Sequence, residues 1–480
     1  MSAVPDLNAE PPLVVDLDGT LIKTDLLLES ALKLLKAHPW SIVQMIFWLL
    51  RGKAVLKAEI ASRVTLDVAT LPYNEVMLQR IREARREGRM VLLATAANIK
   101  YARQVATHLG SFTAVLASDN QNNLRGSHKL RAINDRLRGE AFDYAGNDHD
   151  DLEIWRHSRK ALVVNASAAL VRVARSQREV EVLGPERRWS PSLTLRAMRM
   201  HQWLKNLLVF VPLFAAHEVH TLAANLNAVL AFVAFGLCAS SVYLLNDLLD
   251  MEADRSHPIK HRRPLASGDM SVMHALVLIP LLLGASVAVA AWLPPRFLLI
   301  LAAYFAVTVT YSFWAKRQLI LDVIVLAGLY TLRVIAGAAA AMVAPSFWLL
   351  ALSMFIFLSL ALVKRYSEIL LLGQSNRTKA AGRGYEQGDL PLLQSMGTAS
   401  GYLAVVVIAL YINSPEVRQL YSQPYLLWAI CPLLLLWISW VWMKAHRGQM
   451  HHDPIVFAVK DPTSALIGIL CAVSVVLASR

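Results

Sequence analysis

From about residue 203 onward the chain carries a series of apolar stretches long enough to cross a membrane. A transmembrane helix needs about twenty mostly apolar residues, because the hydrocarbon core of a bilayer is about 30 Å thick. Nine spans are predicted, at approximately 204–221, 225–245, 273–293, 296–313, 320–341, 346–363, 399–412, 424–442 and 463–479. The second half of the chain is therefore predicted to be an all-α membrane domain of nine transmembrane helices.

Basic residues are distributed unevenly among the loops between these spans. The loops after the second, fourth, sixth and eighth spans contain Arg255, Lys260, Arg262, Arg263, Lys316, Arg317, Lys364, Arg365, Arg377, Lys379, Arg383, Lys444, Arg447 and Lys460. The other loops contain only Arg296 and Arg418. Because cytoplasmic loops are enriched in Lys and Arg, the pattern predicts a bacterial-type inner membrane protein with its N-terminus in the cytoplasm. These loops also account for the net charge of +13, so no nucleic-acid partner is expected.

The first part of the chain is predicted to be an α/β domain with a parallel sheet. Apolar runs at Leu13–Val15, Met90–Ala94 and Ala161–Val164 indicate strands, with helical stretches such as Asn74–Arg86 and Ile99–Leu109 between them. Strands that alternate with helices are typical of parallel sheets, whose ligands bind at the carboxyl ends of the strands. The expected division is 1–168 for this domain, 169–200 for a basic connector and 201–480 for the membrane domain.

A helical insertion of roughly residues 26–88 separates the first two strands and is predicted to form a cap. It contains the apolar stretch Trp40–Leu50, which is too short to cross a bilayer. We expect this stretch to form the core of the cap, with membrane contact as the alternative.

Two carboxylates follow the first strand. In Val14-Val15-Asp16-Leu17-Asp18-Gly19-Thr20, residues Asp16 and Asp18 are one residue apart, so their side chains point to the same side. One carboxylate can attack phosphorus while the other protonates the leaving oxygen, with Mg²⁺ offsetting the negative charge.

This motif resembles that of the haloacid dehalogenase (HAD) superfamily, and a Rossmann-like fold with a helical cap is implied. The resemblance assigns metal ligands to Asp16, Asp18 and Asp151, a phosphate-binding hydroxyl to Thr95 and a phosphate-stabilising lysine to Lys129. In the loop Gly146-Asn147-Asp148, Asn147 stands where the family usually has an aspartate, which weakens one metal ligand or shifts it to Asp148. The implied activity is a Mg²⁺-dependent phosphatase.

A second acidic motif follows the second predicted span. It reads Asn246-Asp247-x-x-Asp250-x-x-x-Asp254, and the spacing places Asp247, Asp250 and Asp254 on one face of a helix. Carboxylates at the end of an apolar span are costly unless a cation neutralises them, and Mg²⁺ with a diphosphate suits that role. Three basic residues follow within ten positions and are expected to neutralise phosphate: Lys260, Arg262 and Arg263.

The acidic motif resembles that of the UbiA superfamily of intramembrane prenyltransferases. Lys205, in the segment before the first span, also fits that family. The family usually has a second aspartate-rich motif, but the corresponding stretch here has only Asp322, near Lys316 and Arg333. This departure, together with Lys364-Arg365-Tyr366-Ser367-Glu368 and Asp453–Asp461, resembles the decaprenyl-phosphate phosphoribosyltransferase branch of the superfamily.

The branch implies transfer of 5-phosphoribose from phosphoribosyl diphosphate to a polyprenyl phosphate. Lys316, Asp322, Arg333 and Lys364 would then contact the substrates, and the HAD-like domain would remove the 5-phosphate from the product. Two alternatives stay open: an aromatic prenyltransferase that uses a prenyl diphosphate, as in quinone biosynthesis, and a binding or scaffold protein with degenerate sites. A homo-oligomer is compatible with each of them.

Overall fold

The computed structural model describes residues 10–184, 190–373, 384–450 and 453–479. The basic residues Arg377, Lys379 and Arg383, used above for the topology, lie outside the described residues. The chain divides into two compact units, of which the first contains Met1–Ala197 and Leu244–Leu278, and the second contains Met198–Tyr243 and Ile279–Arg480. The second acidic motif therefore belongs to the first unit, although its helix begins in the second.

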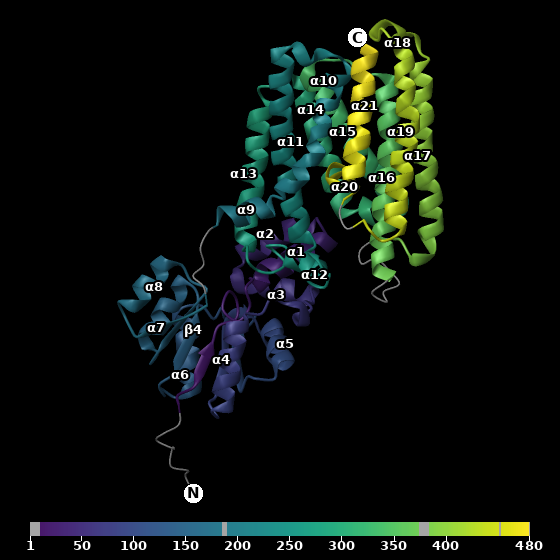
Figure 1. The fold of residues 1–480 in the computed structure, drawn as a ribbon. Coiled ribbons are helices and arrows are strands. Elements are labelled where there is room, and N and C mark those ends of the chain that lie inside the picture. The colour runs from purple at the N-terminus through teal and green to yellow at the C-terminus, as the bar shows by residue number, and fades with distance from the viewer. Residues whose placement is uncertain (1–9, 185–189, 374–383, 451–452, 480) are drawn as a thin grey trace. The chain divides into compact units, whose positions relative to one another are not determined.

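The first unit contains a parallel sheet of six strands in the order β3-β2-β1-β4-β5-β6 (Figure 1). The strands are β1 (Leu13–Val15), β2 (Val91–Asn98), β3 (Ala114–Ser118), β4 (Asp143–Gly146), β5 (Ala161–Val164) and β6 (Val180–Leu183). All pairings along the sheet are parallel. The predicted α/β fold is thus confirmed, and β6 extends the sheet into the segment that was predicted to be a connector.

Helices cover both faces of this sheet. Leu13 and Val15 face a core shared with α4 (Glu75–Arg86) and α5 (Ile99–Leu109). Val14 faces the opposite core, which contains side chains of α6 (Ser127–Leu137), α7 (Leu152–His157) and α8 (Ala168–Arg175). Because β1 is buried on both faces, it reads as a continuous apolar run in the sequence.

The insertion after β1 forms three helices: α1 (Leu26–Ala37), α2 (Ser41–Leu50) and α3 (Lys53–Arg63). Gly52 joins the last two with a φ of 119°, a conformation that side chains other than glycine rarely adopt. The predicted insertion also included α4, but Met77, Ile81 and Ala84 of this helix pack in the sheet core. The cap therefore consists of α1, α2 and α3.

The expectation that Trp40–Leu50 forms the core of the cap is wrong. Within α2 only Ser41 and Trp48 are buried, and the other apolar side chains of the helix are half-buried or exposed. The cap core is instead a small cluster in which Trp48 packs with residues of α1 and α3.

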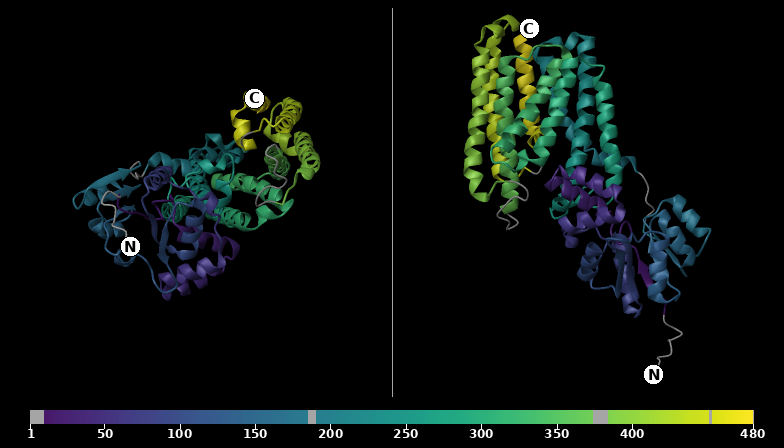
Figure 2. Two further views of the ribbon diagram at one scale, coloured as in Figure 1. Left: turned by 90° about the horizontal axis from the view of Figure 1, so that it is seen from below. Right: turned by 180° about the vertical axis from the view of Figure 1, so that it is seen from behind.

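Eight helices in the described part of the chain are long and apolar enough to cross a membrane, and the long helices run side by side (Figures 1 and 2). They include α11 (Leu222–Leu249), α13 (Val272–Ala290), α14 (Pro295–Phe313), α15 (Leu321–Ala341), α16 (Phe347–Gly373), α17 (Leu390–Ile412), α19 (Ile430–His446) and α21 (Pro462–Ser479). The chain is therefore an integral membrane protein, with spans close to those predicted.

The first predicted span, 204–221, is not one of these eight. Its residues form the 3₁₀-helix η3 (Met200–Phe210) and the short α10 (Val211–Ala215), followed by a turn. The α-helix in this stretch, α10, has five residues, too few to cross a hydrocarbon core by itself. The stretch predicted at 399–412 is the second half of the longer helix α17.

Candidate functional sites

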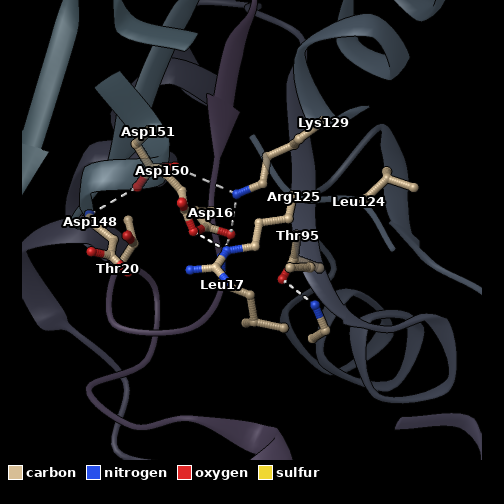
Figure 3. Close-up of polar contacts among 12 residues, drawn as sticks. Asp16, Leu17, Thr20, Thr95, Leu124, Arg125, Lys129, Asp148, Asp150 and Asp151 are labelled. Atoms are coloured by element: carbon tan, nitrogen blue, oxygen red, sulfur yellow. Dashed lines mark hydrogen bonds and ion pairs between the residues drawn. The ribbon is translucent and has the colours of Figure 1, made fainter. Parts of the chain in front are cut away.

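The first candidate site lies where β1 ends. Asp16 directly follows the strand, and Lys129 extends from α6 so that its Nζ lies 3.1 Å from Asp16 Oδ1 and 3.6 Å from Asp151 Oδ1 (Figure 3). All three residues are buried. The structure thus brings together three of the predicted residues, from three separate elements, at the carboxyl edge of the sheet.

Burial dominates the electrostatics of this site. It raises the pKa of Asp16 to about 6, although the nearby Lys129 ammonium opposes the shift. Burial, followed by the charge of Asp25, also raises the pKa of Asp18 well above its usual range. The pKa of Lys129 stays above its ordinary value because the charges of Asp16 and Asp151 outweigh the effect of burial. Asp16, beside the Lys129 ammonium, is suited to nucleophilic attack, and the raised pKa of Asp18 favours a role in general-acid catalysis.

Two hydroxyl groups flank these carboxylates. Thr95 lies two residues beyond Leu93, the partner of Val15 in the sheet, so it reaches the same edge as Asp16. Its buried Oγ1 accepts a hydrogen bond from the Ala97 amide at 3.0 Å. Thr20 Oγ1 donates a hydrogen bond to Asn147 Oδ1 at 3.1 Å.

The loop that contains Asn147 packs directly against the chain after Asp16. A Cβ atom on Gly19 would lie only 2.2 Å from Asn147 Nδ2, so no larger residue than glycine fits at this position. Asp151 organises the same loop, since its Oδ2 accepts hydrogen bonds from the amides of Asn147 and Asp148 at 2.9 and 3.0 Å. The loop thereby holds the Asn147 side chain against Gly19 and Thr20, the residues that directly follow Asp18.

The oxygen atoms of this site fit Mg²⁺ in kind. Asp16, Asp151 and the Asn147 amide provide hard oxygen donors, which Mg²⁺ prefers. Within the described ranges, no three His, Cys, Asp or Glu side chains converge as a metal cluster, here or elsewhere. Because Asn147 is neutral, a metal held here would have one charged ligand fewer than it would have with an aspartate at position 147.

The second candidate site is the acidic motif at the end of α11. The helix ends at Leu249, and Asp250 precedes the short helix α12 (Met251–Arg255) with a non-helical φ of −106°. The three aspartates therefore do not share one continuous helix, as the spacing had predicted. Asp247 and Asp254 still converge, because Arg263 Nη1 donates hydrogen bonds to both, at 3.1 and 2.6 Å.

Arg263 marks where a cation is favourable in this motif. Asp247 and Asp254 are buried and share one guanidinium group, whose single positive charge offsets only one of the two negative charges. Asp250 accepts a hydrogen bond from Lys36 of α1 at 2.8 Å, and the carboxylate oxygens of all three residues are the ligand type that Mg²⁺ requires. The donor set thus fits Mg²⁺, with Arg263 and Lys36 as the protein's own cations. Of the other predicted basic residues, Lys260 is half-buried and Arg262 is exposed.

A third group of charged residues lies inside the second unit and centres on Asp322. This fully buried carboxylate of α15 accepts hydrogen bonds from Nε and Nη2 of Arg365 on α16, the latter at 2.9 Å. Tyr311 of α14 donates a further hydrogen bond at 2.7 Å. The guanidinium group of Arg365 binds Asp322 at two points and neutralises it. Asp322 is therefore the partner of Arg365 in a buried ion pair.

A second buried carboxylate in this unit binds two lysines. Asp453 Oδ2 accepts hydrogen bonds from Lys205 at 2.6 Å and from Lys364 at 3.1 Å. Both lysines were predicted substrate contacts, and the pair carries one positive charge more than the carboxylate neutralises. This excess makes the cluster suitable for a phosphate group.

The buried Arg333 lies among aromatic side chains of the same unit. It donates hydrogen bonds to Asn206 Oδ1 at 3.0 Å and to Tyr304 OH at 2.8 Å. Its guanidinium carbon lies 4.8 Å from the ring centre of Tyr304. Lys316, in contrast, lies in the half-buried turn η6 (Ala315–Arg317) after α14.

Arg365 and Asp453 were not among the predicted site residues. Both lie in stretches quoted above, Lys364–Glu368 and Asp453–Asp461. Arg365 was not assigned to the site because a basic residue at the end of a span also fits a role in membrane topology. The signal that could have identified Arg365 is Asp322 itself, because a carboxylate inside an apolar span requires a partner.

Comparison with known proteins agrees with these features. A model of the UbiA prenyltransferase family matches residues 207–459. An uncharacterized protein of Sinorhizobium fredii, y4nM, is 37% identical over 97% of this chain and 91% of its own length, so it shares both domains. Decaprenyl-phosphate phosphoribosyltransferase of Mycolicibacterium smegmatis is 37% identical over 46% of this chain and 70% of its own length.

Among solved structures, a UbiA homolog from Archaeoglobus fulgidus bound to DMAPP and Mg²⁺ covers 59% of this chain and 96% of its own, with 18% identity and a TM-score of 0.46. The family assignment does not depend on that structure, because the family model alone covers more than half of the 480 residues. The chain belongs to the UbiA prenyltransferase family, with a parallel-sheet α/β domain before its membrane helices.

Proposed function

We propose that the membrane domain is a Mg²⁺-dependent transferase that moves 5-phosphoribose from phosphoribosyl diphosphate to a polyprenyl phosphate. The observation that carries this proposal is the pairing of Asp322 with Arg365. A second diphosphate–metal site would need more than one aspartate, but this stretch supplies only Asp322, which Arg365 binds at two points. The similarity to a decaprenyl-phosphate phosphoribosyltransferase supports the same choice of substrates.

In the proposed reaction, the acidic motif binds the diphosphate of the donor. Asp247, Asp250 and Asp254 would hold Mg²⁺, which supplies positive charge to the diphosphate as it leaves. Arg263 would contact phosphate oxygens when the metal takes its place between the carboxylates. An oxygen of the lipid phosphate attacks the anomeric carbon, the bond from that carbon to the diphosphate breaks, and pyrophosphate is released.

We assign the excess positive charge of Lys205 and Lys364 around Asp453 to a phosphate group of a substrate. Arg333 and Lys316 are proposed to assist in the same role. Asp322 is proposed to position Arg365.

The HAD-like domain is proposed to remove the 5-phosphate from the lipid-linked product. Asp16 attacks phosphorus and forms an aspartyl phosphate, while Asp18 gives its proton to the ribose oxygen that leaves. Lys129 and Thr95 stabilise the phosphoryl oxygens, and Asp151 and Asn147 would hold Mg²⁺ with Asp16. Water then hydrolyses the aspartyl phosphate with Asp18 as the base, and phosphate is released. A cytoplasmic location of both activities in a bacterial inner membrane accords with the basic loops.

Two parallel reactions test the transferase assignment. The purified full-length protein in nanodiscs receives Mg²⁺ with labelled phosphoribosyl diphosphate and polyprenyl phosphate, or with labelled prenyl diphosphate and 4-hydroxybenzoate. We expect labelled lipid in the first reaction, and none when Asp247 is replaced by Asn. Product only in the second reaction would identify an aromatic prenyltransferase instead.

The phosphatase step has its own test. The Asp16→Asn variant should accumulate the 5-phosphorylated lipid, whereas the wild-type protein should release phosphate from it. The matched control is Asp119→Asn, because Asp119 is an exposed carboxylate in the loop after β3. Identical products from wild type and Asp16→Asn would rule out the sequential scheme.

A further inference from the structure

Helix α2 of the cap presents an apolar surface to the outside. Trp40 and Leu50, at its two ends, are 87% and 83% exposed. Between them Ile42, Val43, Ile46, Phe47 and Leu49 are also exposed. We call these seven residues the α2 surface.

The opposite side of α2 already packs against the cap. Ser41, Met45 and Trp48 recur at helical spacing, and Met45 and Trp48 contact the small core formed with α1 and α3. The helix is therefore apolar on the side that packs and on the side that does not. A helix that is apolar all round normally lies within a protein core or in contact with lipid.

The α2 surface is unusual within its domain. Between residues 10 and 184, ten large apolar side chains are exposed, and seven of them form this surface. The other three, Val76, Met90 and Val173, lie in separate elements. Isolated exposed apolar residues are normal, but a continuous patch indicates a site of interaction.

Contacts within the first unit place this helix close to the end of a membrane span. Lys36, near the end of α1 and five residues before α2, donates hydrogen bonds to the Leu249 carbonyl at 2.7 Å and to Asp250 at 2.8 Å. Glu29 of α1 binds Arg255, with one hydrogen bond of 2.9 Å. Leu249 is the last residue of α11, so the cap contacts the end of a helix that is long and apolar enough to cross a membrane.

The sequence around α2 is typical of a helix that lies in a membrane interface. Ten residues extend for about 15 Å, which is too short to cross the hydrocarbon core. An exposed tryptophan precedes the helix, and the exposed cations Arg51 and Lys53 follow it. Tryptophan favours the interface, and basic residues there are attracted to anionic lipids.

We propose that α2 inserts its outer surface into the membrane interface and anchors the cap to an anionic bilayer. The anchor keeps the Asp16 site at the lipid surface. If the phosphatase acts on a lipid-linked phosphate, as proposed above, its substrate then reaches the site without leaving the membrane. The placement of α2 itself does not depend on that activity.

The placement can be tested in the full-length protein in nanodiscs with and without anionic lipid. In a background with Cys238, Cys431 and Cys471 replaced by Ala, single cysteines at Val43 and Phe47 carry a nitroxide label. The control is Val76→Cys, because Val76 is an exposed apolar residue on α4, outside the cap. Collision with lipid-soluble oxygen and with a water-soluble nickel chelate measures the surroundings of each label by electron paramagnetic resonance.

We expect the labels at Val43 and Phe47 to collide more often with oxygen than with the nickel chelate, and the label at Val76 to show the opposite. Removing anionic lipid should shift the α2 labels toward the nickel chelate. The proposal would be overturned if the labels at all three positions collided equally often with the nickel chelate. Labels shielded from both reagents would also overturn it, because a protein partner or a second copy of the chain would then cover α2.

A double variant of the α2 surface tests membrane anchoring separately from catalysis at the Asp16 site. Val43→Glu with Phe47→Glu should reduce release of phosphate from a lipid-linked ribose 5-phosphate at least tenfold and leave hydrolysis of p-nitrophenyl phosphate within twofold of wild type. Val76→Glu is the matched control and should change neither rate. Equal loss of both rates would show that α2 is needed for folding and would contradict the anchoring role. If the wild-type protein hydrolyses neither compound while the labels report lipid contact, the proposed phosphatase fails and the anchor stands.

Discussion

Arg263 and Mg²⁺ compete for the same place in the proposed transferase. The arginine donates hydrogen bonds to Asp247 and Asp254 and offsets part of their combined negative charge. A divalent ion that binds these oxygens must first displace the guanidinium group. Arg263 is then available to contact the phosphates that arrive with the metal.

This competition predicts opposite effects of one substitution. In Arg263→Gln, the Mg²⁺ concentration for half-maximal transfer should fall severalfold, because the two carboxylates lose their internal cation. The KM for the diphosphate donor should rise about tenfold, since one charge-assisted hydrogen bond is worth about 1.5–3 kcal/mol. Titrations of Mg²⁺ and donor with the purified protein measure both. Arg262→Gln is the control, because the exposed Arg262 should give a smaller change in each; a rise in both constants for Arg263→Gln would contradict the competition.

At the scale of elements, the Asp322–Arg365 pair connects α15 and α16, and Tyr311 adds α14. Removing one member of a buried ion pair leaves an uncompensated charge, which costs about 3–5 kcal/mol. We therefore expect Arg365→Met to lower the Tm of the membrane domain strongly. The double variant Asp322→Leu with Arg365→Met should recover much of the loss, because the fully buried carboxylate is removed together with its partner, which leaves the part-exposed Glu368 without its ion pair to Arg365. Thermal unfolding in detergent tests this, and a double variant no more stable than the single one would argue against it.

In the soluble domain, the first residue of β4 offers a pH-dependent test. Burial opposes ionisation of Asp143, but hydrogen bonds from Arg159 and Arg89 outweigh it and lower its pKa. A carboxyl group whose pKa is lower in the folded state stabilises the fold fully above its unfolded pKa of about 3.9 and loses this contribution as pH falls through the folded pKa. Asp143→Asn should therefore speed hydrogen exchange of β1 and β4 amides at pH 7. The difference from wild type should shrink below about pH 4; a difference independent of pH would contradict this origin.

The strands show which elements the sequence could predict. β1 and β5 are fully buried and continuously apolar, so both were predicted with correct bounds. β3 and β6 are the two edges of the sheet and largely half-buried, and neither was predicted: a charged Glu181 interrupts β6, whereas the apolar run Ala114–Ala117 of β3 was missed. β4 is central, but it begins with the buried Asp143 and ends at Gly146, so it lacks the apolar run from which a strand would be predicted.

The candidate sites show a similar division. Motifs with local spacing, such as Asp16 with Asp18, could be read directly from the sequence. The partners that complete them come from distant elements: Arg365 is 43 residues from Asp322, and Lys36 is 214 residues from Asp250. The break in the helix at Asp250 could not be read from the spacing either, because that spacing fits a continuous helix equally well.

At the scale of the whole molecule, two proposed activities share one chain, and the relative from Sinorhizobium fredii aligns with both parts. A tether raises the effective concentration of one site near the product of the other. For a lipid-linked intermediate the advantage is smaller than in solution, because diffusion within the membrane already confines the product. The benefit of fusion should therefore depend on how dilute the protein is in the bilayer.

That benefit can be measured by placing two variants, each of which lacks one of the two activities, in the same vesicle. Asp247→Asn should lack transfer but keep phosphatase activity, and Asp16→Asn should do the reverse. Co-reconstituted at high protein density, the pair should form the dephosphorylated lipid at a rate close to that of the wild-type protein at the same number of active sites. At about one copy of each per vesicle, the pair should lag behind wild type and accumulate the 5-phosphorylated lipid before consuming it. Equal rates without a lag at low density would show that the tether contributes nothing, whereas no final product at any density would show that the two steps occur only within a single chain.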